Sequence, residues 1–106
     1  MPVSDKPWDG SPSRWDSVSA YCAASLIDRR SGGDGSKADC SLPVREPGGA
    51  INRNAVHAAA AALAGGRGGV NASAEEKAMA ARKLVRMYRN DLKEDPPESL
   101  VRLAGN

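Results

Sequence analysis

The sequence predicts a mainly α-helical protein, with a small domain of three to four helices, a short β-hairpin and an extended N-terminal arm. Three observations predict this fold class. Apolar residues recur at spacings of three and four along most of the chain after residue 17. A segment rich in proline and glycine, Glu46–Gly49, lies between two very short apolar segments. The first 16 residues hold three prolines and both tryptophans, and they show no helical period.

The composition is typical of a globular protein, since 41% of the 106 residues are apolar and 26% are charged. Much of the apolar fraction is alanine and Phe is absent, so the core that this chain can build is modest. The length suits one small domain. We expect residues 1–16 to form the arm and residues 17–106 the single helical domain, with a flexible Gly/Ser loop at 31–37.

The first helix is expected over residues 17–28. Asp16 or Ser17 can cap it, because a side-chain oxygen at this position accepts a hydrogen bond from a free backbone N–H. The side chains that would share its inner face are Val18, Tyr21, Cys22, Ser25 and Leu26.

The β-hairpin is expected near residues 42–51. Its two arms, Leu42–Arg45 and Ala50–Ile51, flank Glu46–Gly49, where proline and glycines favour a chain reversal. Pro43 has no N–H to donate to a neighbouring strand, so this hairpin is at most a small edge element.

Three helical segments are expected in the second half of the chain. Asn52 is a good N-cap for a helix over 53–64, which Gly65 and Gly66 end. The segment Ser73–Glu76 matches a capping box and begins a helix over 74–91, and Pro97 opens a last short turn over 98–103. The residues that should meet in one core are Val56, Leu63, Leu84, Val85 and Tyr88.

Net charge and hydropathy limit the classes of function. A net charge of +2 is too balanced to identify a nucleic-acid binder, although a pI near 8.7 leaves that function open. No stretch approaches the ~18 apolar residues of a membrane span, and residues 1–7 lack the apolar core of a signal peptide. We therefore expect a protein that stays in the cytoplasm and does not contact a membrane.

Metal or redox chemistry would have to use Cys22, Cys40 and His57. The two cysteines could form a bridge, but in a reducing cytoplasm we expect Cys22 to be a reduced core residue. A zinc site lacks any paired spacing such as C-x2-C, and His57 has no carboxylate four residues on to orient it. Because no catalytic triad or nucleophile elbow appears either, we expect no enzyme, no metal and no cofactor.

Two tryptophans and one arginine are candidates for contact with a protein partner. Trp8 and Trp15 suit interface anchors, because Trp supplies much apolar area at a low cost in conformational entropy. The alternative is that both rings cover the core of their own domain. Arg67, within Gly65–Gly69, could contact an anionic partner, whereas the alternative for this segment is a glycine-rich helix stop.

A basic face on the third helix indicates a second class of function, nucleic-acid binding. Residues three and four apart on a helix converge, so these cations could lie along a phosphate backbone. They are Arg82, Lys83, Arg86 and Arg89, with Arg53 and Arg67 at the margin. The alternative is a solvated helix face. The carboxylates after residue 90 and the lack of interleaved aromatic residues count against nucleic-acid binding.

Four stretches in order resemble a known family. They are Pro7–Ser11, Leu42–Pro47, Asn52–Val70, and Lys83–Arg89 followed by Asp95–Leu100. This series is similar to a small domain of tailed bacteriophages and prophages, which occurs alone or appended to head-maturation (prohead) proteases and other capsid-region proteins. The resemblance covers nearly the whole chain apart from residues 30–37. It implies a phage head setting, and the catalytic residues of the protease have no counterparts here.

The sequence therefore leads us to expect a non-enzymatic phage head protein that binds the capsid as an assembly accessory or decoration protein. Its partner would be the capsid or another head protein, in the host cytoplasm or the virion head, and self-association stays open. The alternative is a protein that binds DNA without sequence preference through the basic face of the third helix.

Overall fold

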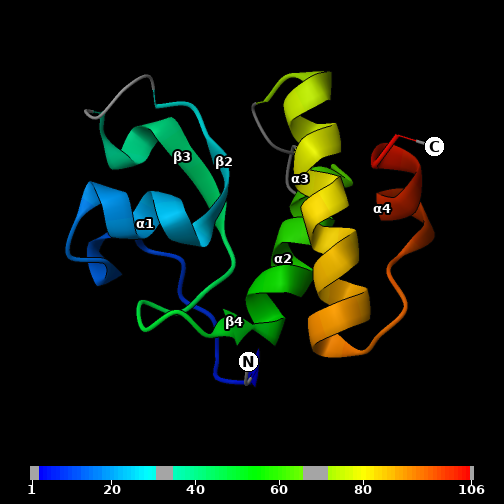
Figure 1. Cartoon of the computed structure of the whole chain (residues 1–106), viewed down its shortest axis with the longest axis horizontal. Helices are drawn as coiled ribbons and strands as arrows, with labels where there is room; N and C mark the ends of the chain where they lie inside the picture. Colours follow the sequence, from blue (N-terminus) through cyan, green and yellow to red (C-terminus); the bar gives the residue numbers. More distant parts are fainter. Residues whose placement is uncertain (1–2, 31–34, 66–71, 106) are drawn as a thin grey trace. The chain divides into compact units, whose positions relative to one another are not determined.

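A computed structural model describes residues 3–30, 35–65 and 72–105 (Figure 1). These residues form four α-helices and a small antiparallel strand pair, as expected for a mainly α protein. By its internal contacts the chain divides into two compact units, Met1–Ala55 and Val56–Asn106. Within the described ranges, no helix is long and apolar enough to cross a membrane.

The first unit contains two small sheets. β1 (Val3–Ser4) pairs in parallel with β4 (Ile51–Asn52), in a register that places Val3 opposite Ile51. β2 (Ser25–Asp28) pairs antiparallel with β3 (Cys40–Pro43). Figure 1 shows β2 and β3 side by side, with α1 next to them.

α1 (Val18–Ala24) is shorter than the expected helix over 17–28. It begins as predicted, because the Ser17 hydroxyl accepts a hydrogen bond of 3.0 Å from the Ala20 N–H. It ends at Ser25, and β2 replaces the last predicted turn. Leu26 and Ile27 are both buried in β2 although successive side chains of a strand point to opposite faces, so both faces of β2 are covered at this point.

The turn predicted between residues 42 and 51 is present, but the hairpin around it is minimal. The Glu46 N–H donates to the Ala50 carbonyl at 2.7 Å, and the Gly49 N–H donates to the Glu46 carbonyl at 2.8 Å. Arg45 and Ile51 form a single isolated antiparallel bridge. The antiparallel strand pair itself is β2 with β3, which the local pattern did not predict, because its two strands are separated by a long connection.

The core of the first unit is built around aromatic rings and sulfur atoms. Its buried members are Trp15, Tyr21, Cys22, Ala24 and Cys40, and Trp8 and Val18 pack against them. Two 3₁₀ turns, η1 (Pro12–Arg14) and η2 (Lys37–Asp39), flank this cluster, and the Lys37 ammonium donates to the Pro12 and Trp15 carbonyls. From Val3 onward the segment expected as an arm thus packs within this unit, through β1 and the two tryptophans.

The second unit is helical and follows the sequence-based boundaries closely. Its elements are α2 (Arg53–Leu63), α3 (Ala74–Arg86), the π-helical turn η4 (Met87–Leu92) and α4 (Glu98–Leu103). α4 packs on α3. All five residues expected in the core are buried: Val56, Leu63, Leu84, Val85 and Tyr88.

The helix ends are determined by the residues that the sequence pointed to. The Asn52 side-chain oxygen accepts from the Ala55 N–H at 2.9 Å. Ser73 and Glu76 form the reciprocal capping box, with bonds of 3.1 and 2.9 Å. Gly65 ends α2 with a φ of +101°, a conformation that favours glycine. Of the expected loop at 31–37, residues 31–34 lie outside the described part of the chain.

Candidate binding sites

The two tryptophans occupy different positions in the first unit. Trp15 is only 2% exposed, and its ring lies edge-on to Trp8 and to Tyr21, with centroid distances of 6.1 and 5.2 Å. It covers the core of its own unit, so in this conformation its ring is not offered to a partner. Trp8 is half-buried at the edge of the same cluster and keeps part of its ring at the surface.

Arg14 links these rings to a carboxylate. Its guanidinium carbon lies 5.6 Å from the ring centroids of both Trp8 and Trp15, a distance typical of a cation–π contact. The same group pairs with Glu46 at 2.7 Å and donates to the Asp9 carbonyl. Trp8 and Arg14 therefore present a flat ring and a planar cation at one edge of the unit.

Glu46 is the centre of a polar network. Besides Arg14, it accepts a hydrogen bond of 2.6 Å from the fully buried Asn52 amide and one of 3.3 Å from the Ser4 hydroxyl. Burial alone would raise the pKa of Glu46, but the hydrogen bonds from Arg14, Asn52 and Ser4 and the charge of Arg14 together hold it below its usual value. Glu46 is therefore held ionised at neutral pH.

A hollow of about 530 Å³ opens beside this network. Lys6, Arg14 and Glu46 give it charged walls, and the remaining lining residues are Val3, Ser4, Pro47, Gly48 and Ala50. Arg14 donates to the Asp9 carbonyl and to Glu46, and Asn52 donates to Glu46, so hydrogen bonds join three segments that are far apart in the sequence.

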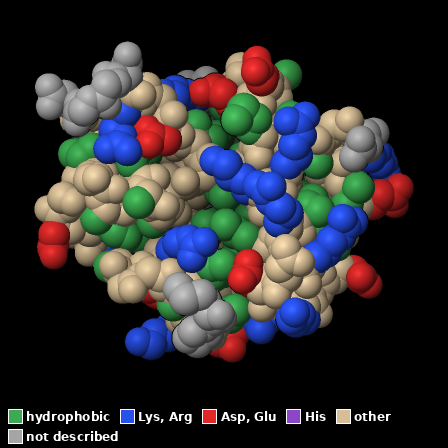
Figure 2. Space-filling model, in the orientation of Figure 1, with side chains coloured by type: hydrophobic (Ala, Val, Ile, Leu, Met, Phe, Trp, Pro, Cys, Tyr) green, Lys and Arg blue, Asp and Glu red, His purple; other side chains and the backbone are tan. Residues whose placement is uncertain are grey.

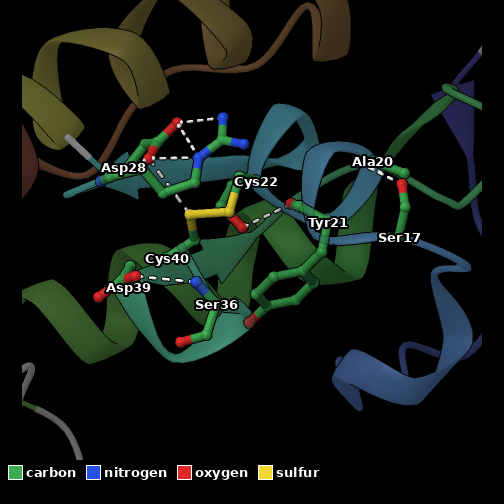
Figure 3. Close-up of a disulfide and its surroundings, with 10 residues drawn as sticks. Ser17, Ala20, Tyr21, Cys22, Asp28, Ser36, Asp39 and Cys40 are labelled. Carbon is green, nitrogen blue, oxygen red and sulfur yellow. Dashed lines mark hydrogen bonds and ion pairs between the residues drawn. A yellow bond between two sulfur atoms is a disulfide. The ribbon is translucent and has the colours of Figure 1, made fainter. Parts of the chain in front are cut away.

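The expectation of a reduced Cys22 is wrong, because Cys22 and Cys40 form a disulfide (Figure 3). α1 runs directly into β2, and the antiparallel return of the chain brings Cys40 of β3 against α1, with the two Cα atoms 5.4 Å apart. Asp28 lies opposite Cys40 in the strand register, and its carboxylate is 3.4 Å from the Cys40 sulfur. Donor atoms of Cys22, Asp28 and Cys40 are close enough for a metal, but the sulfur atoms are bonded to each other.

His57 has a partner that the spacing of residues could not reveal. Its Nε2 lies 3.0 Å from the Glu94 carboxylate, and its ring stacks on Tyr88 with centroids 5.7 Å apart. Glu94 reaches this position because η4 ends at Lys93 in a left-handed conformation, and the Glu94 N–H then donates to the Tyr88 carbonyl. Burial, and then the charge of Glu94, raise the pKa of Tyr88. His57 therefore contacts both the Glu94 carboxylate and the Tyr88 ring.

The basic face predicted on the third helix is present on α3 and η4. Arg82, Arg86 and Arg89 are exposed, Lys83 is half-buried, and Figure 2 shows Lys and Arg side chains gathered along α3. Among the described residues, Arg86 and Arg89 have no hydrogen-bond or ion-pair partner. These guanidinium groups are therefore available to an anion.

Two of the carboxylates expected to neutralise this face have other partners. Glu94 lies 3.0 Å from the His57 Nε2, and Glu98 forms an ion pair with Arg102 at 2.9 Å. One basic residue expected at the margin is also engaged, since Arg53 forms an ion pair of 2.6 Å with Asp5 in the first unit. Arg67, together with most of its glycine-rich segment, lies outside the described residues.

A second hollow, of about 370 Å³, lies against the basic face between α3 and the end of α4. We call it the α3–α4 hollow, and its lining residues are Arg82, Val85, Arg86, Ala104 and Gly105. The Arg82 Nε–H donates to the Ala104 carbonyl at 2.7 Å. Two arginines thus line one wall of a partly apolar depression.

No protein-family model, curated protein or solved structure matches this chain.

Proposed function

We propose that this chain is a non-enzymatic phage head protein that binds the capsid as an assembly accessory or a decoration protein. The observation that carries this proposal is the partly exposed edge formed by the half-buried Trp8 and Arg14, next to the hollow at Glu46. Trp and Arg are the residue types most enriched at the energetic centres of protein interfaces. The phage setting comes from the resemblance of the sequence motifs.

The geometry changes the roles of the two tryptophans in this proposal. Trp8 is the contact residue, because part of its ring reaches the surface. Trp15 packs edge-on behind Trp8 and holds it in place. Arg14 is fixed by Glu46, so little side-chain freedom is lost when a partner covers it. A rigid aromatic edge of this kind suits a repeating, folded protein surface such as a capsid.

Co-sedimentation with purified capsids and proheads tests this function. The wild-type chain should sediment with the particles, and Trp8→Ala should weaken binding by about 10-fold or more, as expected for a central interface tryptophan. Met79→Ala is a matched control, because Met79 is an exposed large apolar residue, 49% exposed, on α3. Absence of the protein from virions and proheads alike would overturn the proposal.

The second candidate function is DNA binding through the basic face, favoured by the unpartnered Arg86 and Arg89. About four phosphate contacts would make log K fall with log[salt] at a slope of about −3 to −4, with no dependence on base sequence. The test is a salt titration of duplex DNA binding by the wild-type chain and by the Arg82→Ala, Arg86→Ala, Arg89→Ala triple variant. No binding at about 50 mM salt, or equal binding by the triple variant, would exclude this function.

A further inference from the structure

We propose that the α3–α4 hollow is a preformed site for one phosphate group, bound by the guanidinium groups of Arg82 and Arg86. The inference rests on the DNA-binding candidate function and deepens it. It assigns one phosphate contact to a defined place, in addition to the general electrostatic attraction along the basic face. The phosphate is that of a phosphodiester backbone, and the experiment below also tests a free phosphate ion.

The first argument is that Arg82 is already oriented. Its Nε–H donates to the Ala104 carbonyl at 2.7 Å, which fixes the plane of the guanidinium against the end of α4. A guanidinium has five N–H donors, so both terminal nitrogens keep donors for a ligand. Because the side chain is ordered before binding, less conformational entropy is lost when an anion arrives.

The second argument is that Gly105 makes room for this orientation. Gly105 follows the C-cap of α4 with a φ of +110°, a conformation that L side chains rarely adopt. A Cβ atom at this position would lie only 2.9 Å from the Arg82 Nη2 atom. Gly105 therefore leaves space for the Arg82 guanidinium in the position from which it donates to the Ala104 carbonyl.

The third argument concerns charge. Arg86 lies one helical turn after Arg82, lines the same hollow, and has no ion-pair partner within the described ranges. Like charges four residues apart on a helix repel each other, and an anion between them removes the repulsion. Guanidinium groups bind phosphate oxygens through paired, charge-assisted hydrogen bonds, which a lysine cannot reproduce.

The remaining walls suit a phosphate that belongs to a larger molecule. Val85 and Ala104 are buried apolar residues among those that line the hollow, and apolar surroundings strengthen charge-assisted hydrogen bonds. The volume of about 370 Å³ exceeds the needs of a single phosphate. The excess accommodates an attached sugar, as in a nucleic-acid backbone.

The experiment uses variants that keep the net charge. The probe is a fluorescent DNA duplex without terminal phosphates, at about 50 mM salt. Arg82→Lys retains the charge and loses the paired donors, and Gly105→Ala retains both arginines and displaces the Arg82 guanidinium. Each should weaken DNA binding by about 5- to 20-fold. Circular dichroism confirms that each variant is folded, and Arg82→Lys carries the test alone if Gly105→Ala does not fold.

Two matched controls define the expected baseline. Arg102→Ala removes a positive charge from α4, where the side chain is 70% exposed and paired with Glu98, and it should change the affinity by less than about 3-fold. Gly48→Ala adds a methyl group where no atom lies within 4 Å, and it should change nothing.

A second arm uses inorganic phosphate and follows the side-chain N–H resonance of Arg82 in the full chain. If DNA binds and both charge-neutral variants bind as tightly as wild type, the site is refuted while DNA binding stands. If DNA does not bind but millimolar phosphate shifts the Arg82 resonance in wild type and not in Gly105→Ala, the site stands with a free phosphate as its ligand. If DNA does not bind and phosphate does not shift the Arg82 resonance, both DNA binding and the phosphate site are refuted.

Discussion

Glu46→Gln should destabilise the first unit by about 2 kcal/mol. Glu46 accepts hydrogen bonds from three donors, on Ser4, Arg14 and Asn52. A glutamine has the same shape but only one acceptor oxygen, and its amide N–H groups would face those donors. At least one hydrogen bond to a charged group is lost, which costs about 1.5–3 kcal/mol. We take a middle value because the Arg14 side chain is still 29% exposed.

Urea unfolding followed by tryptophan fluorescence measures this loss. Both tryptophans of the chain, Trp8 and Trp15, lie in the first unit, so their emission reports its unfolding. In a thermal scan the same change should lower Tm by about 8–16 °C for a unit of this size. Asp5→Asn is the matched control, because Asp5 is 69% exposed in its pair with Arg53, and it should leave the midpoint unchanged.

The pH dependence gives an independent check on Glu46. Its pKa is lower in the folded chain than in the unfolded chain, so the stabilisation is present above the unfolded value, about 4.3. It disappears as the pH falls through the folded value. The difference between wild type and Glu46→Gln should therefore stay constant from about pH 7 down to about 4.3, and narrow only as the pH falls further, through the folded value. Equal midpoints at neutral pH, or a difference that does not change with pH, would refute the reasoning.

Three further stability predictions concern both units. Leu84→Ala should cost about 2–4 kcal/mol in chemical denaturation followed by circular dichroism, since Leu84 is fully buried, and a wild-type midpoint would mean that this face of α3 is not in the core. Reducing the Cys22–Cys40 disulfide should lower the free energy of unfolding by about 3 kcal/mol, because the bond links residues 18 positions apart. The midpoint of unfolding followed by tryptophan fluorescence measures this loss, and an unchanged midpoint on reduction would contradict the prediction. Ser73→Ala should cost about 1 kcal/mol by removing the capping box, whereas exposed Ser19→Ala should cost less.

The helices of the second unit could be predicted because their limits depend on neighbouring residues. Asn52, Ser73 and Pro97 act within four positions of their own place in the sequence, so their effects are visible in the sequence. β2 could not be predicted in this way. Its partner β3 lies beyond a long connection, and pairing overrode the helical spacing that ends at Leu26.

The candidate sites likewise include features that local sequence predicts and features that depend on distant residues. The basic face followed from helical spacing alone, because Arg82, Arg86 and Arg89 share one side of consecutive turns. Contacts between distant residues left no such signal. The disulfide required the return of β3 against α1, and the Glu94–His57 pair required the left-handed turn at Lys93.

The parallel pairing of β1 with β4 has a consequence for the order of events during synthesis. Asp5 and Arg53, whose ion pair lies beside this sheet, are 48 positions apart. At a synthesis rate of about 5–20 residues per second, roughly 2–10 s therefore pass between the synthesis of β1 and that of its partner β4. The β1–β4 pair cannot form before Ile51 emerges. The hydrogen bonds within the helices that follow join nearby residues, so they do not require a strand made much earlier.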